Sequence, residues 1–405
     1  MNDSIFMRLR HALGEAMVER DRGGRPRVSP DSTDGVAQVC GLAHEQGWQV
    51  RVEGQGSWMP NDAPADLALS TRGLARIVDL APADLVATVE AGVPLAELQH
   101  ELDAQGAWLA IDAPGGPERT LGSIVATGTA GPLHHGFGPV RDHILGGAIV
   151  TGDGRVIKAG GSVVKNVAGY DLTKLQVGGF GAFGVITQLH LRLRARPADR
   201  VTLIARGERD LLTHQARTLM EKNLTASALE LLSPALAAEA DWVLALEITG
   251  TIDGVAAEME RATESSEVSW TPLPADRAAA FWRATARGIL GGEVTLRLGL
   301  FPDGLDEMID LLAEHLDTGL VTAGPGHGML RWSGEATVDA LRTVRRLAAQ
   351  REIPLTLERG PWPLRHAFGH FGAYREGVAR LVAKLRSTFD PDPTFAVALE
   401  GTEYE

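Results

Sequence analysis

Apolar residues recur with helical spacing early in the chain, between residues 34 and 46. They fall at positions i, i+3, i+4 and i+7 of one helical face, namely Val36, Val39, Cys40 and Ala43. Gly47 is suited to end this helix, and the stretch 48–53 that follows predicts a strand. The pattern therefore predicts a helix, then a strand, then the glycine-rich loop that begins at Gly54.

Three further elements follow from the same kind of pattern. A second helix is predicted to begin near Pro94 and to stop around Gly106, with leucines repeating along one face. A hairpin is predicted between residues 146 and 158, because two apolar stretches flank a Thr-Gly-Asp-Gly turn. Between residues 189 and 194, leucines alternate with His and Arg, which predicts a half-buried strand with a solvated basic face.

The pattern changes after Pro197, where glycine becomes less frequent and Leu/Ala/Glu-rich helical stretches dominate. Strand-like stretches at 242–248 and 294–300 lie among those helices. A chain of 405 residues exceeds what one hydrophobic core usually holds. We therefore expect an α+β protein with one domain at 1–198 and a second domain at 199–405.

Composition narrows the functional classes. The net charge of −13 makes nucleic acid an unfavourable partner, because a polyanion would be repelled. The single cysteine, Cys40, excludes intrachain disulfides and an iron–sulfur cluster held by this chain alone, and we expect it to be a core residue. The N-terminus has charged residues and no apolar run, so neither a signal peptide nor a membrane span is expected, and a cytoplasmic location follows.

The first candidate site is the loop 54–60, which directly follows the predicted strand. Its glycines allow positive φ angles, so that successive backbone N–H groups can converge on a phosphate oxygen. Pro60 and Pro64 argue against the helix that follows such a loop in a Rossmann site, and no Walker Gly-Lys-Ser/Thr sequence follows. Taken alone, this loop is also compatible with a plain turn.

Two later stretches are also rich in glycine and other small residues. Residues 115–132 combine Gly, Ser, Thr and Ala, which leaves room for a flat cofactor against the backbone. A packing seam between helix and sheet would explain the small residues but not the many polar ones. The stretch 165–172, followed by the glycine-dense segment 178–187, adds a cation in Lys165.

These segments together resemble the FAD-binding domain of the vanillyl-alcohol-oxidase family, also called the PCMH-type fold. The motifs that carry the resemblance are TLGSIVATGTAGP, FGPVRDHILG, KNVAGYDLTKLQVGG and GAFGVIT. They are similar to the D-2-hydroxyacid dehydrogenase branch, which includes the subunits of glycolate oxidase. The resemblance implies two α+β subdomains that form the FAD-binding domain, followed by an α+β cap domain.

The resemblance also implies which residues bind FAD. The pyrophosphate would lie on the first loop, at Gly54, Gln55, Gly56 and Ser57. The dinucleotide would be lined by Leu121, Gly122 and Ser123, with Gly128 and Thr129 nearby. The flavin would lie beside Arg141 and Asp142, and backbone would be presented by Gly184, Val185 and Ile186. Many relatives have a second glycine in place of Ser123.

Lys165 has two interpretations. A cation near the pyrimidine end of a flavin would favour the anionic reduced form, and a surface lysine is the alternative. Its place inside a matching motif favours cofactor contact. Asp171 and Arg141 have a similar alternative, because the two side chains could form a structural ion pair instead.

The chain also departs from the family pattern. The first loop lacks the histidine to which some members attach FAD, so non-covalent binding is expected. The stretch 324–332 lacks the histidine-rich metal and substrate motif of catalytic relatives. His366 and His370 are spaced i, i+4, but nearby glycines weaken a helix there, and we expect no metal site. The tail has Asp-Pro-Thr at 392–394 where relatives have Asn-Pro-Gly, which leaves the docking of the tail open.

The leading functional hypothesis is an FAD-binding subunit of a glycolate oxidase complex, which oxidises glycolate to glyoxylate. Its partners would be a catalytic FAD subunit and an iron–sulfur subunit that receives the electrons, and the complex could hold the chain at the inner face of the membrane. One alternative is a self-sufficient D-2-hydroxyacid dehydrogenase with Arg297, Arg331 or Arg359 as a carboxylate clamp. Another is a non-catalytic subunit that only holds flavin in the assembly.

Overall fold

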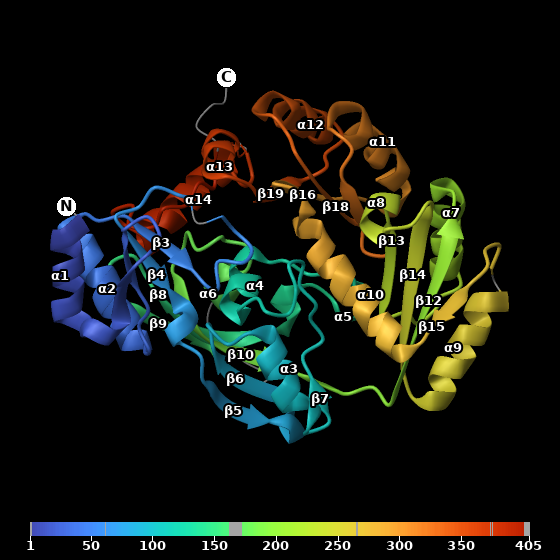
Figure 1. The fold of residues 1–405 in the computed structure, drawn as a ribbon, viewed down its shortest axis with the longest axis horizontal. Coiled ribbons are helices and arrows are strands. Elements are labelled where there is room, and N and C mark those ends of the chain that lie inside the picture. The colour runs from blue at the N-terminus through green and yellow to red at the C-terminus, as the bar shows by residue number, and fades with distance from the viewer. Residues whose placement is uncertain are drawn as a thin grey trace.

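The computed structural model describes residues 2–60, 62–161, 172–264, 266–372, 374 and 376–400. Figure 1 shows two lobes, with the N-terminal half in blue to green at the left and most of the C-terminal half in yellow to orange at the right. The last helix, α14 (Glu376–Phe389), in red, returns to the N-terminal lobe.

The first subdomain packs two helices against a small mixed sheet. Its elements are α1 Asn2–Leu13, β1 Val18–Arg20, β2 Pro26–Val28, α2 Thr33–Gln46, β3 Val50–Glu53 and β4 Leu67–Ser70. The strand order is β1-β2-β4-β3, and β3 and β4 run parallel. The glycine loop therefore leaves the sheet at the carboxyl end of an edge strand.

Helix α2 confirms the first predicted element. The Ser32 hydroxyl accepts a hydrogen bond from the Gly35 amide at its start, and Gly47 adopts the left-handed conformation at its end. Cys40 is fully buried in the core beneath it, and this burial raises the pKa of its thiol. The cysteine is thus a core residue, as the helical spacing predicted.

The second subdomain is an antiparallel sheet covered by short helices. Its elements are β5 Ile77–Ala81, β6 Val86–Glu90, α3 Leu95–Asp103, β7 Ala107–Trp108, α4 Leu121–Thr127, α5 His134–Phe137, β8 Ile144–Val150, β9 Val156–Gly160, α6 Leu172–Gln176, β10 Val185–Arg192 and β11 Arg194–Ala195. The strand order of the main sheet is β5-β6-β10-β8-β9. The predicted hairpin is β8 with β9, and the alternating strand is the end of β10, with its leucines in the core.

The C-terminal lobe contains one large sheet with a separate hydrophobic core. Its elements are β12 Asp199–Gly207, α7 Arg209–Glu221, β13 Ala228–Leu232, α8 Pro234–Ala237, β14 Trp242–Gly250, α9 Ile252–Glu264, β15 Thr271–Leu273, α10 Ala275–Gly288, β16 Val294–Gly299, α11 Leu305–His315, β17 Leu320–Gly324, β18 Met329–Gly334, α12 Val338–Gln350, β19 Leu355–Arg359 and α13 Trp362–Phe368. The strand order is β15-β12-β14-β13-β17-β18-β16-β19. The predicted α+β class, with two subdomains and a cap, is confirmed.

The tail docks onto the first lobe even though it lacks the Asn-Pro-Gly motif. After α14, Glu376–Phe389, the chain runs beside β3, where the Val50 amide donates to Thr394 O at 2.7 Å and the Ala396 amide donates to Val50 O at 3.0 Å. The Asp390 carboxylate accepts hydrogen bonds from the amides of Thr394 and Phe395 and so holds the turn. An aspartate-capped turn therefore replaces the missing motif.

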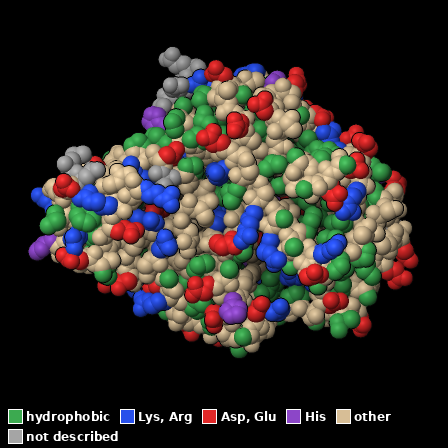
Figure 2. All heavy atoms as spheres, viewed as in Figure 1, with side chains coloured by type: hydrophobic (Ala, Val, Ile, Leu, Met, Phe, Trp, Pro, Cys, Tyr) green, Lys and Arg blue, Asp and Glu red, His purple; other side chains and the backbone are tan. Residues whose placement is uncertain are grey.

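The surface is mixed in character. Acidic and basic side chains are interspersed over the face shown in Figure 2. No helix in the described part of the chain combines the length and apolarity that crossing a bilayer requires.

Candidate cofactor site

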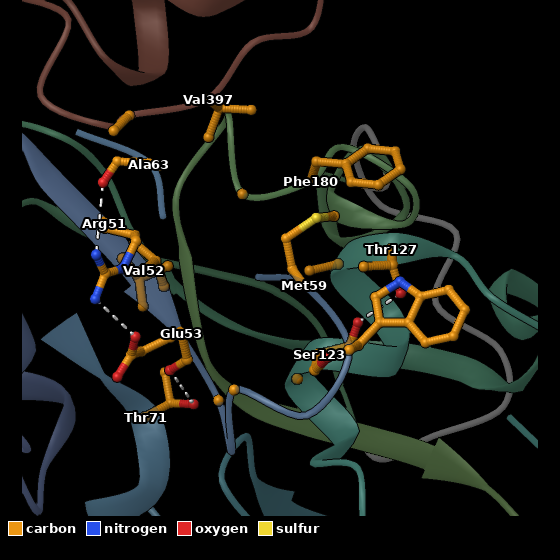
Figure 3. A pocket seen from close by; sticks show the side chains of 18 of the residues that line it. Arg51, Val52, Glu53, Met59, Ala63, Thr71, Ser123, Thr127, Phe180 and Val397 are labelled. Atoms are coloured by element: carbon orange, nitrogen blue, oxygen red, sulfur yellow. Dashed lines mark hydrogen bonds and ion pairs between the residues drawn. The ribbon is translucent and has the colours of Figure 1, made fainter. Parts of the chain in front are cut away.

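A cleft opens where the first loop, α4, the turn before β10 and the tail meet. Figure 3 shows Met59, Ser123, Thr127 and Phe180 on one side of it, and Arg51 and Glu53 on the other. Of the residues predicted to bind the cofactor, eight line the cleft. They belong to the first loop, to α4 and to the start of β10, namely Gly54, Gly56, Ser57, Gly122, Ser123, Gly184, Val185 and Ile186. The structure thus brings together segments that lie more than a hundred residues apart.

The first loop presents backbone donors that have no acceptor. Within the described residues, the amide N–H groups of 55–59 make no hydrogen bond. Gly56 has φ +71°, in the left-handed region that favours glycine. The buried indole Nε1 of Trp58 also lacks a partner in this part of the structure. A row of free N–H groups at a strand end fits an anionic group such as a pyrophosphate.

The second wall is the helix α4. The Thr120 hydroxyl caps it by accepting a hydrogen bond from the Ser123 amide at 3.3 Å. Gly122 packs so closely on the residue directly after β6 that an added Cβ would lie 2.8 Å from the Ala91 Cβ. Packing of helix against sheet therefore requires this glycine, whether or not a cofactor is bound.

Arg119 explains why a serine is accommodated at position 123. Its guanidinium is fully buried, and its Nη2 donates to Ser123 Oγ at 3.2 Å and to Thr127 Oγ1 at 2.8 Å, while its Nη1 donates to Thr129 Oγ1 at 2.8 Å. Burial lowers the pKa of Arg119 to about 9. The hydroxyl of Ser123 is therefore held from behind by this guanidinium.

The third wall contains a residue that sequence reasoning did not place in the cleft. His370 lines it, stacks on Phe180 with ring centroids 3.8 Å apart, and makes a 2.6 Å hydrogen bond between Nδ1 and Leu357 O. Burial lowers the pKa of His370 to about 3, so the ring is neutral at physiological pH. His366 lies on α13 with its ring against Trp362, and the described residues contain no cluster suited to a metal ion.

The other predicted residues lie elsewhere. Gln55 is in the first loop with an exposed side chain, and Leu121 is buried in the core of the second subdomain. Gly128 ends α4, and Thr129 is bound to Arg119. Lys165 lies outside the described residues, as does Asp171.

Arg141 and Asp142 occupy a turn outside the cleft residues. Both side chains are more than half exposed, and Arg141 Nε lies 3.7 Å from Asp142 Oδ1. The structure therefore pairs Arg141 with its own neighbour.

The arginines considered as a carboxylate clamp are bound within the protein. Glu358 is buried and receives Arg331 Nε at 2.8 Å and Arg297 Nε at 3.2 Å. Burial opposes ionisation of Glu358, but these two arginines outweigh it and lower its pKa. Arg297 also donates to Gly128 O at 2.9 Å, which ties the cap to the end of α4.

Two arginines from the far end of the cap hold the first loop. Arg359 Nε donates to Trp58 O at 3.0 Å, and Arg365 forms an ion pair with Asp62 and donates to Pro60 O at 3.3 Å. The loop that carries the free amides is therefore clamped by residues about three hundred positions away.

We expect Asp62→Ala to weaken FAD binding about three- to tenfold, because the clamp loses its acceptor and the amides of the loop become less ordered. Fluorescence titration of the apoprotein with FAD measures the effect. Asp66→Ala is the matched control, since Asp66 accepts the Gln49 amide at 2.8 Å without contacting the cap. Equal FAD affinity in the two variants would contradict a role for the clamp.

Comparison with known proteins agrees with this geometry. A family model described as "FAD binding domain" matches residues 26–160. The chain is 43% identical over 128 residues to glycolate oxidase subunit GlcE of Escherichia coli (strain K12), which covers 31% of this chain and 37% of that subunit. It is 26% identical over 250 residues to glycolate oxidase subunit GlcD of Bacillus subtilis (strain 168), covering 58% and 53% of the two chains.

Two further proteins are similar to this chain, one in sequence and one in structure. The mitochondrial cytochrome-type D-lactate dehydrogenase of Arabidopsis thaliana is 34% identical over 184 residues, with 44% of this chain and 31% of that protein covered. A solved structure of alkyldihydroxyacetonephosphate synthase superposes with a TM-score of 0.74 at 12% identity, covering 98% of this chain and 85% of that one, and so supports the fold.

The matched regions span between about a third and about half of the length of these curated relatives. The family match includes the first loop and α4, and the motifs that predicted the domain lie in or directly after it. The chain therefore carries an FAD-binding domain of the PCMH type.

Proposed function

We propose that this chain is the FAD-binding subunit of a glycolate oxidase complex that oxidises glycolate to glyoxylate. The observation that carries the proposal is the cleft with free loop amides, in a chain that is 43% identical over 128 residues to a glycolate oxidase subunit. In the proposed complex, a catalytic FAD subunit and an iron–sulfur subunit are the partners. The complex is cytoplasmic and contacts the inner face of the membrane through its partners.

The cofactor would be held without a covalent bond. The amides of 55–59 would bind the pyrophosphate, Gly122 and Ser123 would line the dinucleotide, and the segment 184–186 would present backbone to it. His370 is neutral and hydrogen-bonded through Nδ1, which supports a packing role in the cleft. When bound, FAD would relay electrons from the substrate-reduced flavin of the catalytic subunit to the iron–sulfur subunit.

Two features support a subunit over a self-sufficient dehydrogenase. Arg297 and Arg331 are paired with the buried carboxylate of Glu358, and neither lines the cofactor cleft, so neither is placed to hold a substrate carboxylate against the flavin. The single cysteine cannot ligate an iron–sulfur cluster alone, so the electrons would have to leave to a cluster in another protein. We also propose the division into a flavin domain, 1–198, and a cap with C-terminal segment, 199–405.

We expect the isolated, FAD-loaded chain to oxidise glycolate and D-lactate negligibly, because the candidate clamps Arg297, Arg331 and Arg359 do not line the cofactor cleft. Steady-state reduction of an artificial dye, with and without the partner subunits, measures this. Addition of the partners should restore turnover. Robust turnover by the isolated chain would instead support the self-sufficient dehydrogenase.

The same assay separates the third possibility. A complex assembled with a variant of this chain that cannot bind FAD should lose dye reduction. Full activity of such a complex would mean that the flavin of this chain is not used in electron transfer, and would reduce the chain to an assembly subunit.

A further inference from the structure

A second cavity of about 190 Å³ lies between the cap sheet and the flavin domain. One water molecule needs about 10–15 Å³, so the volume of this cavity is far larger than one water molecule requires. Its walls are mainly apolar and come from both lobes, including Leu95, Ile111, Pro117, Trp282 and Ile289. Among the residues that the structure describes, none lines both this cavity and the cofactor cleft, so the two are distinct.

One buried polar atom that has no partner among the described residues lies on the wall of this cavity, and a second lies next to it. Glu230, on β13, lines it and is 3% exposed, and its Oε2 has no hydrogen-bond partner in the described part of the chain. His327 Nε2, 3.8 Å from that oxygen, is likewise buried and unpartnered there. Leaving such groups unsatisfied costs free energy, which a ligand with complementary polar atoms would recover.

The histidine supplies a donor. The Met329 amide donates to His327 Nδ1 at 3.3 Å, which places the proton of the neutral ring on Nε2. Burial, and then the neighbouring His134 and His135, lower the pKa of His327 to about 2, so the ring stays neutral. The Nε2–H group therefore lies 3.8 Å from the Glu230 carboxyl group, beyond hydrogen-bond distance.

A cation lines the same cavity. Arg331 Nε and Nη2 are bound to Glu358, whereas its Nη1 makes no hydrogen bond within the described residues. Arg331 and Arg297 share the single carboxylate of Glu358, so this cluster has an excess of positive charge when the other acids are protonated.

The two other acids are held toward their neutral forms. Burial raises the pKa of Glu230 to about 8, against the opposing effects of Thr322 and Arg331, and Asp112 adds to the increase. Burial likewise raises the pKa of Asp112 to about 7. At a pH below its own pKa, Glu230 is protonated and offers an O–H donor next to His327 and Arg331.

We propose that this cavity binds a small monocarboxylic acid with an apolar body, whose carboxylate lies between Arg331 and Glu230 and whose carbon chain packs against Trp282 and Ile289. Each part of the ligand matches a group on the wall. The guanidinium supplies the charge, the protonated acid donates a hydrogen bond, and the apolar side chains bury the body. Very short acids such as glycolate lack the apolar body.

Calorimetric titration with hexanoate tests the proposal on both the apoprotein and the FAD-loaded protein. Each buried methylene should tighten binding about fourfold, so hexanoate should bind on the order of a hundredfold more tightly than acetate. Hexanol and hexylamine should bind at least about tenfold more weakly than hexanoate. Equal binding of these probes, absence of hexanoate binding, or competition between hexanoate and FAD would overturn the proposal.

The pH dependence identifies the residues. Hexanoate affinity should fall as the pH rises through about 7 and then about 8, because ionised Asp112 and ionised Glu230 both repel the ligand carboxylate. Glu230→Gln keeps a donor at this position and should lose the part of the fall near pH 8, while the part due to Asp112 remains. Glu90→Gln is the matched control, since Glu90 is a buried carboxyl on β6 that pairs with Arg76 and does not line the cavity, and it should keep the wild-type profile.

A second variant fills the cavity and leaves its charged residues unchanged. Ala286→Phe places an aromatic ring in the cavity and should abolish hexanoate binding while leaving FAD binding intact. Unchanged hexanoate affinity in this variant, or an unchanged pH profile in Glu230→Gln, would place the binding elsewhere and overturn the assignment.

Discussion

We expect Gly56→Val to lower the affinity for FAD by on the order of 10–100-fold or more. Gly56 has φ +71°, which a β-branched residue adopts only at a cost of about 1–3 kcal/mol. Relief of that strain would turn the loop and misdirect the free amides of 55–59. The valine methyl groups would also occupy space next to the phosphate oxygens. Fluorescence titration of the folded variant with FAD measures the loss.

Gly106→Val is the matched control for this substitution. Gly106 has φ +66°, an added Cβ there would meet nothing within 4 Å, and the residue lies outside the cleft. It carries the same backbone strain, so it should cost stability without changing FAD affinity. Unchanged FAD affinity in a folded Gly56→Val protein would show that this loop is not the pyrophosphate site.

We expect Arg119→Met to lower the free energy of unfolding of the apoprotein by about 2–4 kcal/mol, because it leaves several buried acceptors without a donor. The guanidinium donates to Pro114 O, Ser123 Oγ, Thr127 Oγ1 and Thr129 Oγ1. Its plane also lies 4.5 Å from the ring centroid of Trp58. Since Ser123, Thr127 and Trp58 all line the cleft, FAD binding should weaken as well.

Urea unfolding of the apoprotein measures the stability change. Arg196→Met is the control, because Arg196 is about half exposed and pairs with Asp103 at 2.6 Å on the surface. Such pairs contribute about 0–1 kcal/mol. If Arg119→Met were no more destabilising than Arg196→Met, the buried guanidinium would not be the support that its hydrogen bonds indicate.

Local patterns predicted the elements that depend on local physics. Helix α2 was predictable because Ser32 and Gly47 cap it and its apolar residues share one face. The β8–β9 hairpin was predictable because a short polar turn separates two apolar strands. The glycine loop was also predictable as a candidate site, because the positive φ angle at Gly56 depends on the local sequence.

Contacts between distant segments were not predictable from spacing. His370 reaches the cleft only because the tail folds back onto β3, and Arg365 reaches Asp62 across the whole chain. Gly122 and Ser123 line the cleft, but the helical phase of α4 directs the neighbouring Leu121 side chain into the core. The motif that contains Arg141 likewise did not show that this side chain is exposed, because exposure depends on how the whole chain packs.

The central claim is that the PCMH-type domain holds FAD in this cleft without a covalent bond. The direct measurement is the visible spectrum of the purified protein, followed by acid precipitation and chromatography of the supernatant. We predict a yellow protein that releases intact FAD into the supernatant. A colourless protein that takes up no FAD on reconstitution, or a flavin that stays with the precipitated chain, would contradict this account.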